Sequence, residues 1–348
     1  SDVISTRGGD DTVVGGTGDD VINGGDGNDQ ITGFVGADTV DGGNNDDTIV
    51  LDATSADLNA ATNAQIVNVE NVTAASAASA VSIDLGNQND GFTVTGSVNN
   101  DTIQGSTAAD SISAGDGNDQ ITGFVGADTV DGGNNDDTIV LDATSADLNA
   151  ATNAQIVNVE NVTAASAASA VSIDLGNQND GFTVTGSVNN DTIQGSTAAD
   201  SISAGDGNDD VKGDAGNDTI NGGLGNDTLE GEAGDDVING GDGNDQITGF
   251  VGADTVDGGN NDDTIVLDAT SADLNAATNA QIVNVENVTA ASAASAVSID
   301  LGNQNDGFTV TGSVNNDTIQ GSTAADSISA GDGNDQITGF VGADTVDG

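Results

Sequence analysis

A nine-residue period runs through most of this chain and restricts the folds open to it. From Gly15 the sequence reads GGTGDDVIN, GGDGNDQIT, GFVGADTVD and GGNNDDTIV, a frame of Gly-Gly-x-Gly-x-Asp-x-U-x in which U is a large aliphatic residue. The frame occurs in 24 nonads, in four runs whose aspartates are nine residues apart. A short fixed period of this kind is typical of solenoids, in which each repeat packs on its neighbours.

The nonad itself indicates how one turn of such a solenoid would be built. Glycine accepts positive φ without steric cost, so the glycine-rich half predicts a tight turn. The following Asp-x-U-x predicts a short strand whose aliphatic side chain points inward. Two nonads would close one flattened coil, and stacked coils would pair their strands in parallel about 4.8 Å apart. The predicted fold class is therefore all-β, a parallel β-roll or β-solenoid rod with glycine-rich turns.

A longer repeat is superimposed on the nonads. Residues 26–115, 116–205 and 242–331 are the same 90-residue string, and a fourth copy begins at Asp332. The segment 206–241 lies between the second and third copies and consists of nonads close to the consensus. An array of this kind lengthens a solenoid without adding new chemistry.

Each long repeat contains 45 residues that interrupt the nonads and are rich in Ala, Ser and Thr. The stretch ATSADLNAATNAQ predicts a short helical turn with Ser55 as its N-cap. The stretches IVNVENVT, VSIDL and FTVT alternate apolar and polar residues as short strands do. Because 45 residues equal five nonads, we expect the solenoid to continue through this insert with different loops.

Charge points to a cation between the turns. The chain has 58 acidic residues against two basic ones, a net charge of −56, and contains no Cys or His. Stacking would place Asp above Asp along each edge, while one buried aliphatic residue per nonad is a small core. Calcium fits best, because it takes six to eight oxygen ligands in flexible geometry. Magnesium demands stricter octahedral geometry, and zinc and copper lack their usual His or Cys ligands.

The nonads resemble the RTX repeats, which form calcium-bound parallel β-rolls. The resemblance covers about three fifths of the chain. It implies that the aspartates of two stacked turns share a calcium ion with carbonyl groups of the glycine loops. The implied pairs are Asp20 with Asp38, Asp29 with Asp47, and Asp209 with Asp227.

Some turns depart from the frame at the fourth position. Asn45 can still adopt a left-handed conformation there. Asn99 and Ala108 precede Asp101 and Asp110, which are therefore left out of the predicted sites. The predicted calcium ligands are Asp11, Asp20, Asp29, Asp38, Asp47, Asp119, Asp128, Asp137, Asp191, Asp200, Asp209, Asp218, Asp227, Asp236, Asp245, Asp254, Asp263, Asp335 and Asp344, with Gly16, Gly18, Gly25, Gly27, Gly216, Gly223, Gly225, Gly234, Gly241 and Gly243 of their turns.

The segments are predicted to alternate along the chain. RTX β-roll segments are expected at 1–50, 96–140, 186–266 and 312–348, and inserts at 51–95, 141–185 and 267–311. One phenylalanine per long repeat stands where the second glycine of a nonad should be. These residues are expected to cover the edge of the roll, or alternatively to contact a neighbouring molecule; they are Phe34, Phe124, Phe250 and Phe340.

Composition excludes several functions. A polyanion with two cations is not expected to bind nucleic acid phosphates or anionic lipid, and no apolar run is long enough to insert into a membrane. A catalytic role is not expected, because every candidate Asp recurs many times whereas an active site is usually unique. An ice-binding row of outward threonines is not predicted either, because Val21, Gln30 and Ser111 interrupt it.

Two main functions remain from the sequence, and a calcium buffer or mineral-nucleating surface is a third, weaker one. The first is a non-enzymatic calcium-binding structural protein of the bacterial cell surface or extracellular matrix: a surface layer, fibre or adhesin stalk. The inserts also resemble the repeats of bacterial surface-layer proteins. Its expected partners are further copies of itself, in a filament or lattice, and possible cell-surface polysaccharide. The alternative is the secretion and folding module of a larger toxin or enzyme exported by the type I route, as the RTX resemblance implies.

Overall fold

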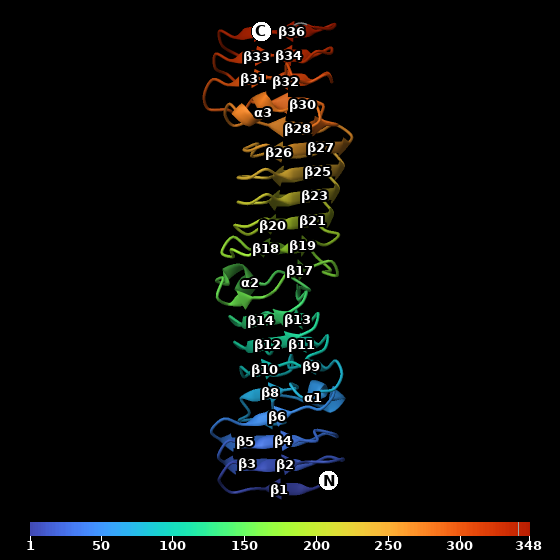
Figure 1. Cartoon of the computed structure of the whole chain (residues 1–348), viewed down its shortest axis with the longest axis vertical. Helices are drawn as coiled ribbons and strands as arrows, with labels where there is room; N and C mark the ends of the chain where they lie inside the picture. Colours follow the sequence, from blue (N-terminus) through green and yellow to red (C-terminus); the bar gives the residue numbers. More distant parts are fainter. Residues whose placement is uncertain (340) are drawn as a thin grey trace. The chain divides into compact units, whose positions relative to one another are not determined.

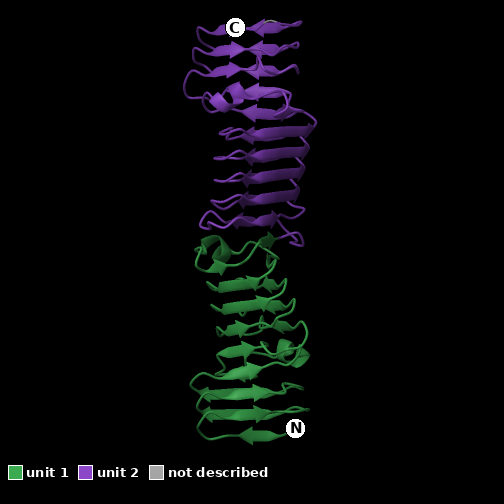
Figure 2. Ribbon diagram, in the orientation of Figure 1, with its two compact units in different colours: residues 1–163 green, residues 164–348 purple. Residues whose placement is uncertain are grey.

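The computed structural model describes residues 1–339 and 341–348, and the chain forms two compact units (Figure 2). Unit 1 comprises residues 1–163 and unit 2 residues 164–348. Each unit is a solenoid of short parallel strands (Figure 1), which confirms the predicted all-β fold class.

Unit 1 contains three parallel sheets and two short helices. One sheet has the order β1 (Val3–Ser5), β3 (Val21–Asp26), β5 (Thr39–Asn44), β7 (Ile66–Val67). The eight-stranded sheet has the order β2 (Thr12–Val14), β4 (Gln30–Thr32), β6 (Thr48–Val50), β8 (Asn71–Thr73), β10 (Thr93–Thr95), β12 (Ser111–Asp116), β14 (Thr129–Asn134), β16 (Ile156–Val157). The third contains β9 (Ser82–Asp84), β11 (Thr102–Gln104), β13 (Gln120–Thr122), β15 (Thr138–Val140) and β17 (Asn161–Thr163). The helices are α1 (Ala56–Ala60) and α2 (Ala146–Ala150).

Unit 2 repeats this plan. One face carries β18 (Ser172–Asp174), β20 (Thr192–Gln194), β22 (Asp210–Lys212), β24 (Thr228–Glu230), β26 (Gln246–Thr248), β28 (Thr264–Val266), β30 (Asn287–Thr289), β32 (Thr309–Thr311), β34 (Ser327–Ser329) and β36 (Thr345–Asp347). The other carries β19 (Thr183–Thr185), β21 (Ser201–Asp206), β23 (Thr219–Leu224), β25 (Val237–Asp242), β27 (Thr255–Asn260) and β29 (Ile282–Val283), and then β31 (Ser298–Asp300), β33 (Thr318–Gln320) and β35 (Gln336–Thr338). Its helix is α3 (Ala272–Ala276).

The eighteen-residue coil is confirmed by the strand register. Ile220 of β23 is paired with Ile202 on one side and with Ile238 on the other, and both pairings are parallel and eighteen residues apart. These aliphatic side chains are at most 2% exposed, so they form the core, while the residues on either side of them face outward. Alternation with a period of two thus puts one aliphatic residue per nonad inside the coil.

The inserts continue the solenoid with larger coils. Ser55 caps α1 as expected, because its Oγ accepts a hydrogen bond from the Leu58 N–H at 3.0 Å. The helix closes an open strand edge: the Asn59 amide donates to the Ser82 carbonyl at 3.1 Å and accepts from the Asp84 N–H at 3.0 Å. An asparagine side chain therefore makes the two hydrogen bonds that a preceding strand would make to β9.

The expectation that the solenoid continues through the insert with different loops is confirmed, but the insert does not supply the five strands that five nonads would. Residues 51–95 contain four strands and one helix, so that β6 before the insert and β11 after it belong to different sheets. Each 90-residue repeat consequently contains an odd number of strands. In unit 1, Gln30–Thr32 of β4 and the identical Gln120–Thr122 of β13 lie on opposite faces of the solenoid.

The phenylalanines at the second nonad position cover the edge of the core. Phe34, Phe124 and Phe250 are 3%, 2% and 5% exposed, which confirms the expectation that they cover the roll. Phe340 lies outside the described residues. Serine hydroxyls of the following segment anchor the loops in which they lie: Ser55 Oγ donates to the Phe34 carbonyl at 2.7 Å, and Ser145 Oγ to that of Phe124 at 2.6 Å.

Candidate metal sites

The aspartates of the nonads form ladders inside the turns. The N–H of Asp209 donates to Asp227 Oδ1 at 2.9 Å, and the Asp227 N–H donates to Asp245 Oδ1 at 2.8 Å. Asp20 and Asp38 are joined in the same way at 2.9 Å, as are Asp29 and Asp47 at 2.7 Å. The three pairs predicted from the sequence are thus stacked neighbours. One carboxylate oxygen of each pair is used to hold two turns together.

The second oxygen of these carboxylates has a different environment. Among the described residues, thirteen nonad aspartates have a buried Oδ2 that accepts no hydrogen bond. A buried carboxylate oxygen without a donor is costly unless a cation or proton compensates it. These residues are Asp20, Asp29, Asp38, Asp47, Asp119, Asp137, Asp209, Asp218, Asp227, Asp236, Asp245, Asp254 and Asp263.

Backbone carbonyl groups converge on the same point. A Cβ placed on Gly222 would lie 2.7 Å from the Gly240 carbonyl oxygen of the stacked turn and would overlap Asp227 Oδ2. A Cβ on Gly240 would likewise overlap both Asp245 Oδ2 and the Gly258 carbonyl. The first glycine of a nonad therefore keeps a carboxylate oxygen and a carbonyl oxygen close together, with no side chain between them.

The predicted glycines shape the turns. Gly223, Gly225, Gly241 and Gly243 have φ values of 111°, 126°, 108° and 145°, which side chains rarely adopt. Asn45 has a φ of 83°, so asparagine does replace glycine in the left-handed conformation, as expected. The first glycines, such as Gly222, were not among the predicted residues. Their contacts to the carboxylates depend on the stacking of two coils, which no single nonad reveals.

Burial and stacking act together on the acidity of these groups. Desolvation, with repulsion from the stacked Asp227 and Asp191, raises the pKa of Asp209 to about 7. The pKa of Asp218 rises to about 7 for the same reasons, with Asp236 and Asp200 as the repelling neighbours. Burial and neighbouring carboxylates raise the pKa of Asp119, Asp254 and Asp263 to about 6. The ladders therefore hold negative charge that needs a counter-ion near neutral pH.

The donor set fits calcium. In the described part of the chain, no group of three acidic side chains is placed to hold a metal ion, so side chains alone could not surround one. Carboxylate and carbonyl oxygens together are the ligands that calcium accepts in flexible numbers. The residues that would hold it are the thirteen aspartates with a free Oδ2 and the glycine carbonyls stacked against them. Bound calcium would supply the positive charge that these buried oxygens lack.

Glutamates that the period does not reveal end three of the ladders. The N–H of Asp47 donates to Glu70 Oε2 at 2.9 Å, that of Asp137 to Glu160 Oε2 at 2.8 Å, and that of Asp263 to Glu286 Oε2 at 2.9 Å. Each glutamate takes the place of the next aspartate in the stack. Because Glu70 follows Asp47 by 23 residues rather than eighteen, the nonad frame gives no signal for it.

The structure separates some predicted ligands from the rest. Asp191 and Asp200 belong to turns that begin Gly-Ser, and their Oδ2 atoms accept hydrogen bonds from the N–H groups of Ser187 and Ser196, both at 2.6 Å. Both oxygens of these two carboxylates accept hydrogen bonds from their own turns, and their role as calcium ligands stays a prediction. The Val125 N–H likewise donates to Asp128 Oδ2 at 2.9 Å.

Aspartates near the two ends of the chain are less buried than the others. Asp11, Asp335 and Asp344 are half-buried. They still join the ladders: the Asp11 N–H donates to Asp29 Oδ1 at 2.8 Å, and Asp335 Oδ1 accepts from Asp317. Their role as calcium ligands remains a prediction.

A parallel solenoid whose glycine turns stack buried carboxylates on carbonyl groups defines a class of calcium-binding repeat proteins. The profile of the RTX calcium-binding nonapeptide repeat matches residues 1–22, 14–49, 95–123, 105–139, 125–143, 185–220, 212–247, 230–265 and 311–348. These matches cover more than half of the chain. The chain therefore belongs to the RTX calcium-binding nonapeptide repeat family.

Other comparisons add little. No protein with a curated function matches the sequence. One similar solved structure is the X-ray crystal structure of a hyperactive, Ca²⁺-dependent, beta-helical antifreeze protein from an Antarctic bacterium. It is 18% identical, the alignment covers 99% of this chain and 83% of that one, and the TM-score is 0.24. A score this low supports no further conclusion. No helix in the described residues is long and apolar enough to cross a membrane.

The raised pKa values predict how the calcium-free fold depends on pH. Because the pKa values of Asp209 and Asp218 are about 7 in the folded chain and near 3.8 when unfolded, protonation favours the folded state. This stabilisation is fully present below pH 3.8 and is lost as the pH rises through 7. Thermal unfolding of calcium-free protein should therefore show a higher Tm at pH 5.5 than at pH 8.

Exposed carboxylates provide the internal comparison for this measurement. The ordinary pKa of an aspartate or glutamate side chain is near 4, so a change of Tm between pH 5.5 and 8 reports on carboxylates whose pKa is raised by burial. Saturating calcium should remove this dependence, because the ion stabilises the charged carboxylates. A calcium-free Tm that is constant or rises over this interval would contradict the assignment.

Proposed function

We propose that this chain is a non-enzymatic structural repeat protein of the bacterial cell surface or extracellular matrix, folded and stiffened by calcium. The observation that carries the proposal is the multiplication of one buried carboxylate site along both units, with thirteen examples among the described residues. Every long repeat adds coils and calcium sites of the same kind. The calcium sites support an extracellular location, because calcium-binding modules outside the cell work at the high calcium concentrations found there.

The arrangement of the long repeats supports self-association into a filament or lattice. Since each repeat contains an odd number of strands, identical surface strands such as β4 and β13 lie in different sheets on opposite faces of unit 1. A molecule with the same patch on two opposite sides can bind a copy of itself on each side. Such contacts do not form a closed ring, so further copies can be added and an extended assembly results.

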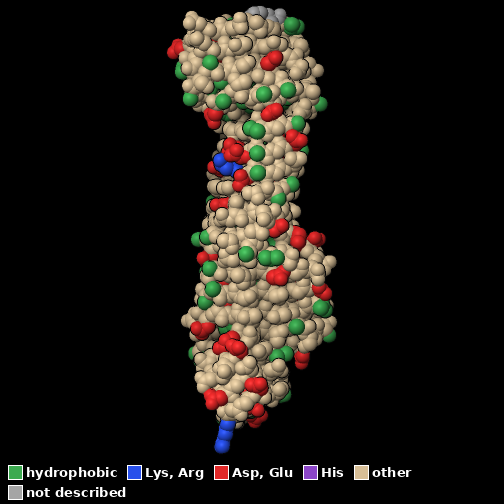
Figure 3. All heavy atoms as spheres, turned by 60° about the vertical axis from the view of Figure 1, so that its left-hand side comes forward, with side chains coloured by type: hydrophobic (Ala, Val, Ile, Leu, Met, Phe, Trp, Pro, Cys, Tyr) green, Lys and Arg blue, Asp and Glu red, His purple; other side chains and the backbone are tan. Residues whose placement is uncertain are grey.

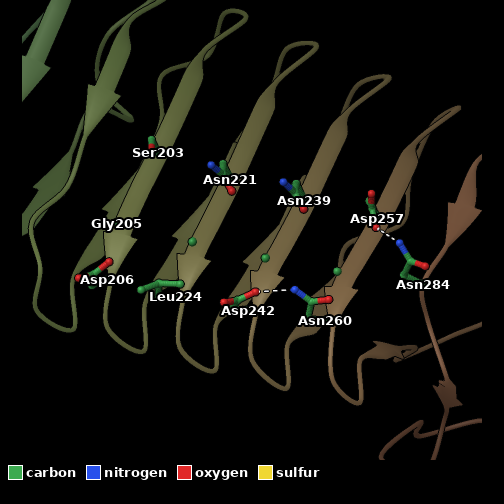
Figure 4. Close-up of a pocket in the computed structure, with 13 residues that line it drawn as sticks. Ser203, Gly205, Asp206, Asn221, Leu224, Asn239, Asp242, Asp257, Asn260 and Asn284 are labelled. Atoms are coloured by element: carbon green, nitrogen blue, oxygen red, sulfur yellow. Dashed lines mark hydrogen bonds between the residues drawn. The ribbon is translucent and has the colours of Figure 1, made fainter.

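The surface of the solenoid is suited to polar contacts. Acidic side chains are scattered over the face seen in Figure 3, most of which is uncharged. On β21, β23, β25 and β27, two rows of mostly polar side chains border a strip of glycines (Figure 4). One row is Ser203, Asn221, Asn239 and Asp257, continued by Asn284 just after β29, and the other is Asp206, Leu224, Asp242 and Asn260. Amide and carboxylate groups along this strip can hydrogen-bond sugar hydroxyls, which supports cell-surface polysaccharide as a partner.

The alternative function is that of a secretion and folding module within a larger type I-secreted toxin or enzyme. Membership of the RTX family favours it, because the matching nonads would fold outside the cell in the same way. Electron microscopy of the chain in millimolar calcium separates the two proposals. The structural role predicts filaments or lattices that EGTA disperses. Isolated particles at every protein concentration would contradict that role and favour the module.

A further inference from the structure

Six turns of the solenoid are closed by serine. They begin Gly-Ser instead of Gly-Gly, and their serines are Ser97, Ser106, Ser187, Ser196, Ser313 and Ser322. In each, the serine N–H donates to Oδ2 of the nonad aspartate four residues later, at distances from 2.5 to 2.8 Å. The serine Oγ donates to Oδ1 of the same carboxylate, at 2.9 to 3.1 Å.

These serine-closed turns contrast with the Gly-Gly turns at the same place in the coil. Ser97 and Asp101 are 3% and 1% exposed, and Asp227 in a Gly-Gly turn is also 1% exposed. Burial is thus the same, but Oδ2 of Asp227 has no hydrogen-bond donor whereas Oδ2 of Asp101 has one. Two hydrogen bonds to a carboxylate stabilise its charge, as a cation would. The serine therefore supplies from within the turn what the glycine turn must obtain from a bound ion.

The serine-closed turns directly follow the inserts, which have a denser core. Between Leu51 and Ile103, fourteen apolar side chains are buried, among them Leu58, Leu85 and Phe92. The 36 residues of 206–241 bury only four, which are Val211, Ile220, Leu229 and Ile238. Hydrophobic stabilisation scales with the apolar surface removed from water. The insert and the two turns after it can therefore hold together by packing and hydrogen bonds alone.

The inserts and the Gly-Gly nonads also differ in their density of acidic side chains. Residues 51–95 contain five acidic side chains, whereas the shorter segment 206–241 contains ten. Without a counter-ion, repulsion is consequently greater in the Gly-Gly nonads, whose carboxylates are stacked directly on one another. The two parts of the chain thus differ in core, charge and closure of the turn.

We propose that serine at the second position of a nonad determines that its turn closes without calcium. Each insert and the two serine-closed turns after it then form a segment that stays folded in the absence of the ion, as in residues 51–113 and 267–329. The Gly-Gly nonads between them depend on calcium. This inference rests on the proposed calcium-dependent folding and adds that the dependence is confined to one class of turn. Calcium would then order the chain between elements that are already folded.

Hydrogen–deuterium exchange of the full chain in calcium and in EGTA tests this division. Peptides from 206–241 are unique, whereas those from 92–113 report jointly on identical copies. In EGTA we expect fast exchange in 206–241 and retained protection in 92–113. Fast exchange in both would overturn the serine inference but leave calcium-dependent folding intact. Protection in both would overturn calcium-dependent folding as well as the division.

Substitution tests whether the serines cause the protection from exchange that is retained in EGTA. The double variant Ser313→Gly with Ser322→Gly gives the third copy peptides of distinct mass, and we expect them to lose protection in EGTA while the unmodified copies keep it. The matched control is Ser327→Gly with Ser329→Gly, which changes two exposed serines of β34. Equal protection in the two variants would contradict the role assigned to Ser313 and Ser322.

Discussion

Removal of calcium at pH 8 is expected to unfold the Gly-Gly nonads. These turns contain the aspartates whose buried Oδ2 accepts no hydrogen bond, including Asp209, Asp218, Asp227 and Asp236. Without the ion, each charged carboxylate is buried beside the next, with a single aliphatic residue per nonad to offset the cost. Far-ultraviolet circular dichroism should show the loss of most of the β-structure that these nonads contribute when EGTA is added.

Recovery distinguishes calcium from a general effect of ionic strength. Excess calcium should restore the spectrum, whereas sodium at equal ionic strength should not. Magnesium should be much less effective, because it keeps its waters and demands octahedral geometry. A spectrum that is indifferent to EGTA would contradict calcium-dependent folding of the nonads.

Replacing one ladder aspartate should remove calcium binding locally. Asp227→Asn keeps an oxygen that can accept the Asp209 N–H, now at 2.9 Å, but loses the charge of the free carboxylate oxygen. Calcium affinity depends on the number of charged ligands, so we expect the affinity of the affected site to fall by about tenfold or more. Isothermal titration should show at least one ion fewer bound at a calcium concentration that saturates the native chain.

Asp210→Asn is the matched control for this variant. Asp210 lies on β22 beside a predicted ligand, but its side chain is exposed and faces away from the core. The variant changes the net charge equally, so it should bind as many ions as the native chain. Equal losses in the two variants would mean that calcium responds to overall charge and not to the ladder.

Much of the fold could be predicted because one local rule is repeated. The glycine positions, the inward aliphatic residue and the aspartate are all visible within a single nonad, and the eighteen-residue register follows from two of them. The exchange of faces across the insert, which puts β6 and β11 in different sheets, could not be predicted in this way. It arises because α1 folds back and presents Asn59 to the edge of β9, a contact between residues 23 to 25 positions apart.

The candidate sites were predicted only in part for a related reason. The stacked pairs, such as Asp209 and Asp227, follow from the period. The end of a ladder at Glu70 depends on the larger coil of the insert. The distinction between Asp191 and Asp227 depends on one residue, since Ser187 donates two hydrogen bonds where Gly223 offers no side chain. The Gly-Ser sequence was visible, but the direction of its hydrogen bonds was not.

The net charge of −56 is explained by this arrangement. A large share of the acidic residues lies inside the turns, where it would repel if no cation were bound. The same residues thus favour unfolded Gly-Gly nonads without calcium and folded ones with it.

Anomalous X-ray diffraction from crystals grown in calcium tests the central claim most directly. The predicted result is an anomalous peak beside Asp227 Oδ2 and the Gly240 carbonyl, repeated at the equivalent points of the other Gly-Gly turns. Crystals in which the ladder aspartates are ordered but carry no anomalous peak would contradict the account.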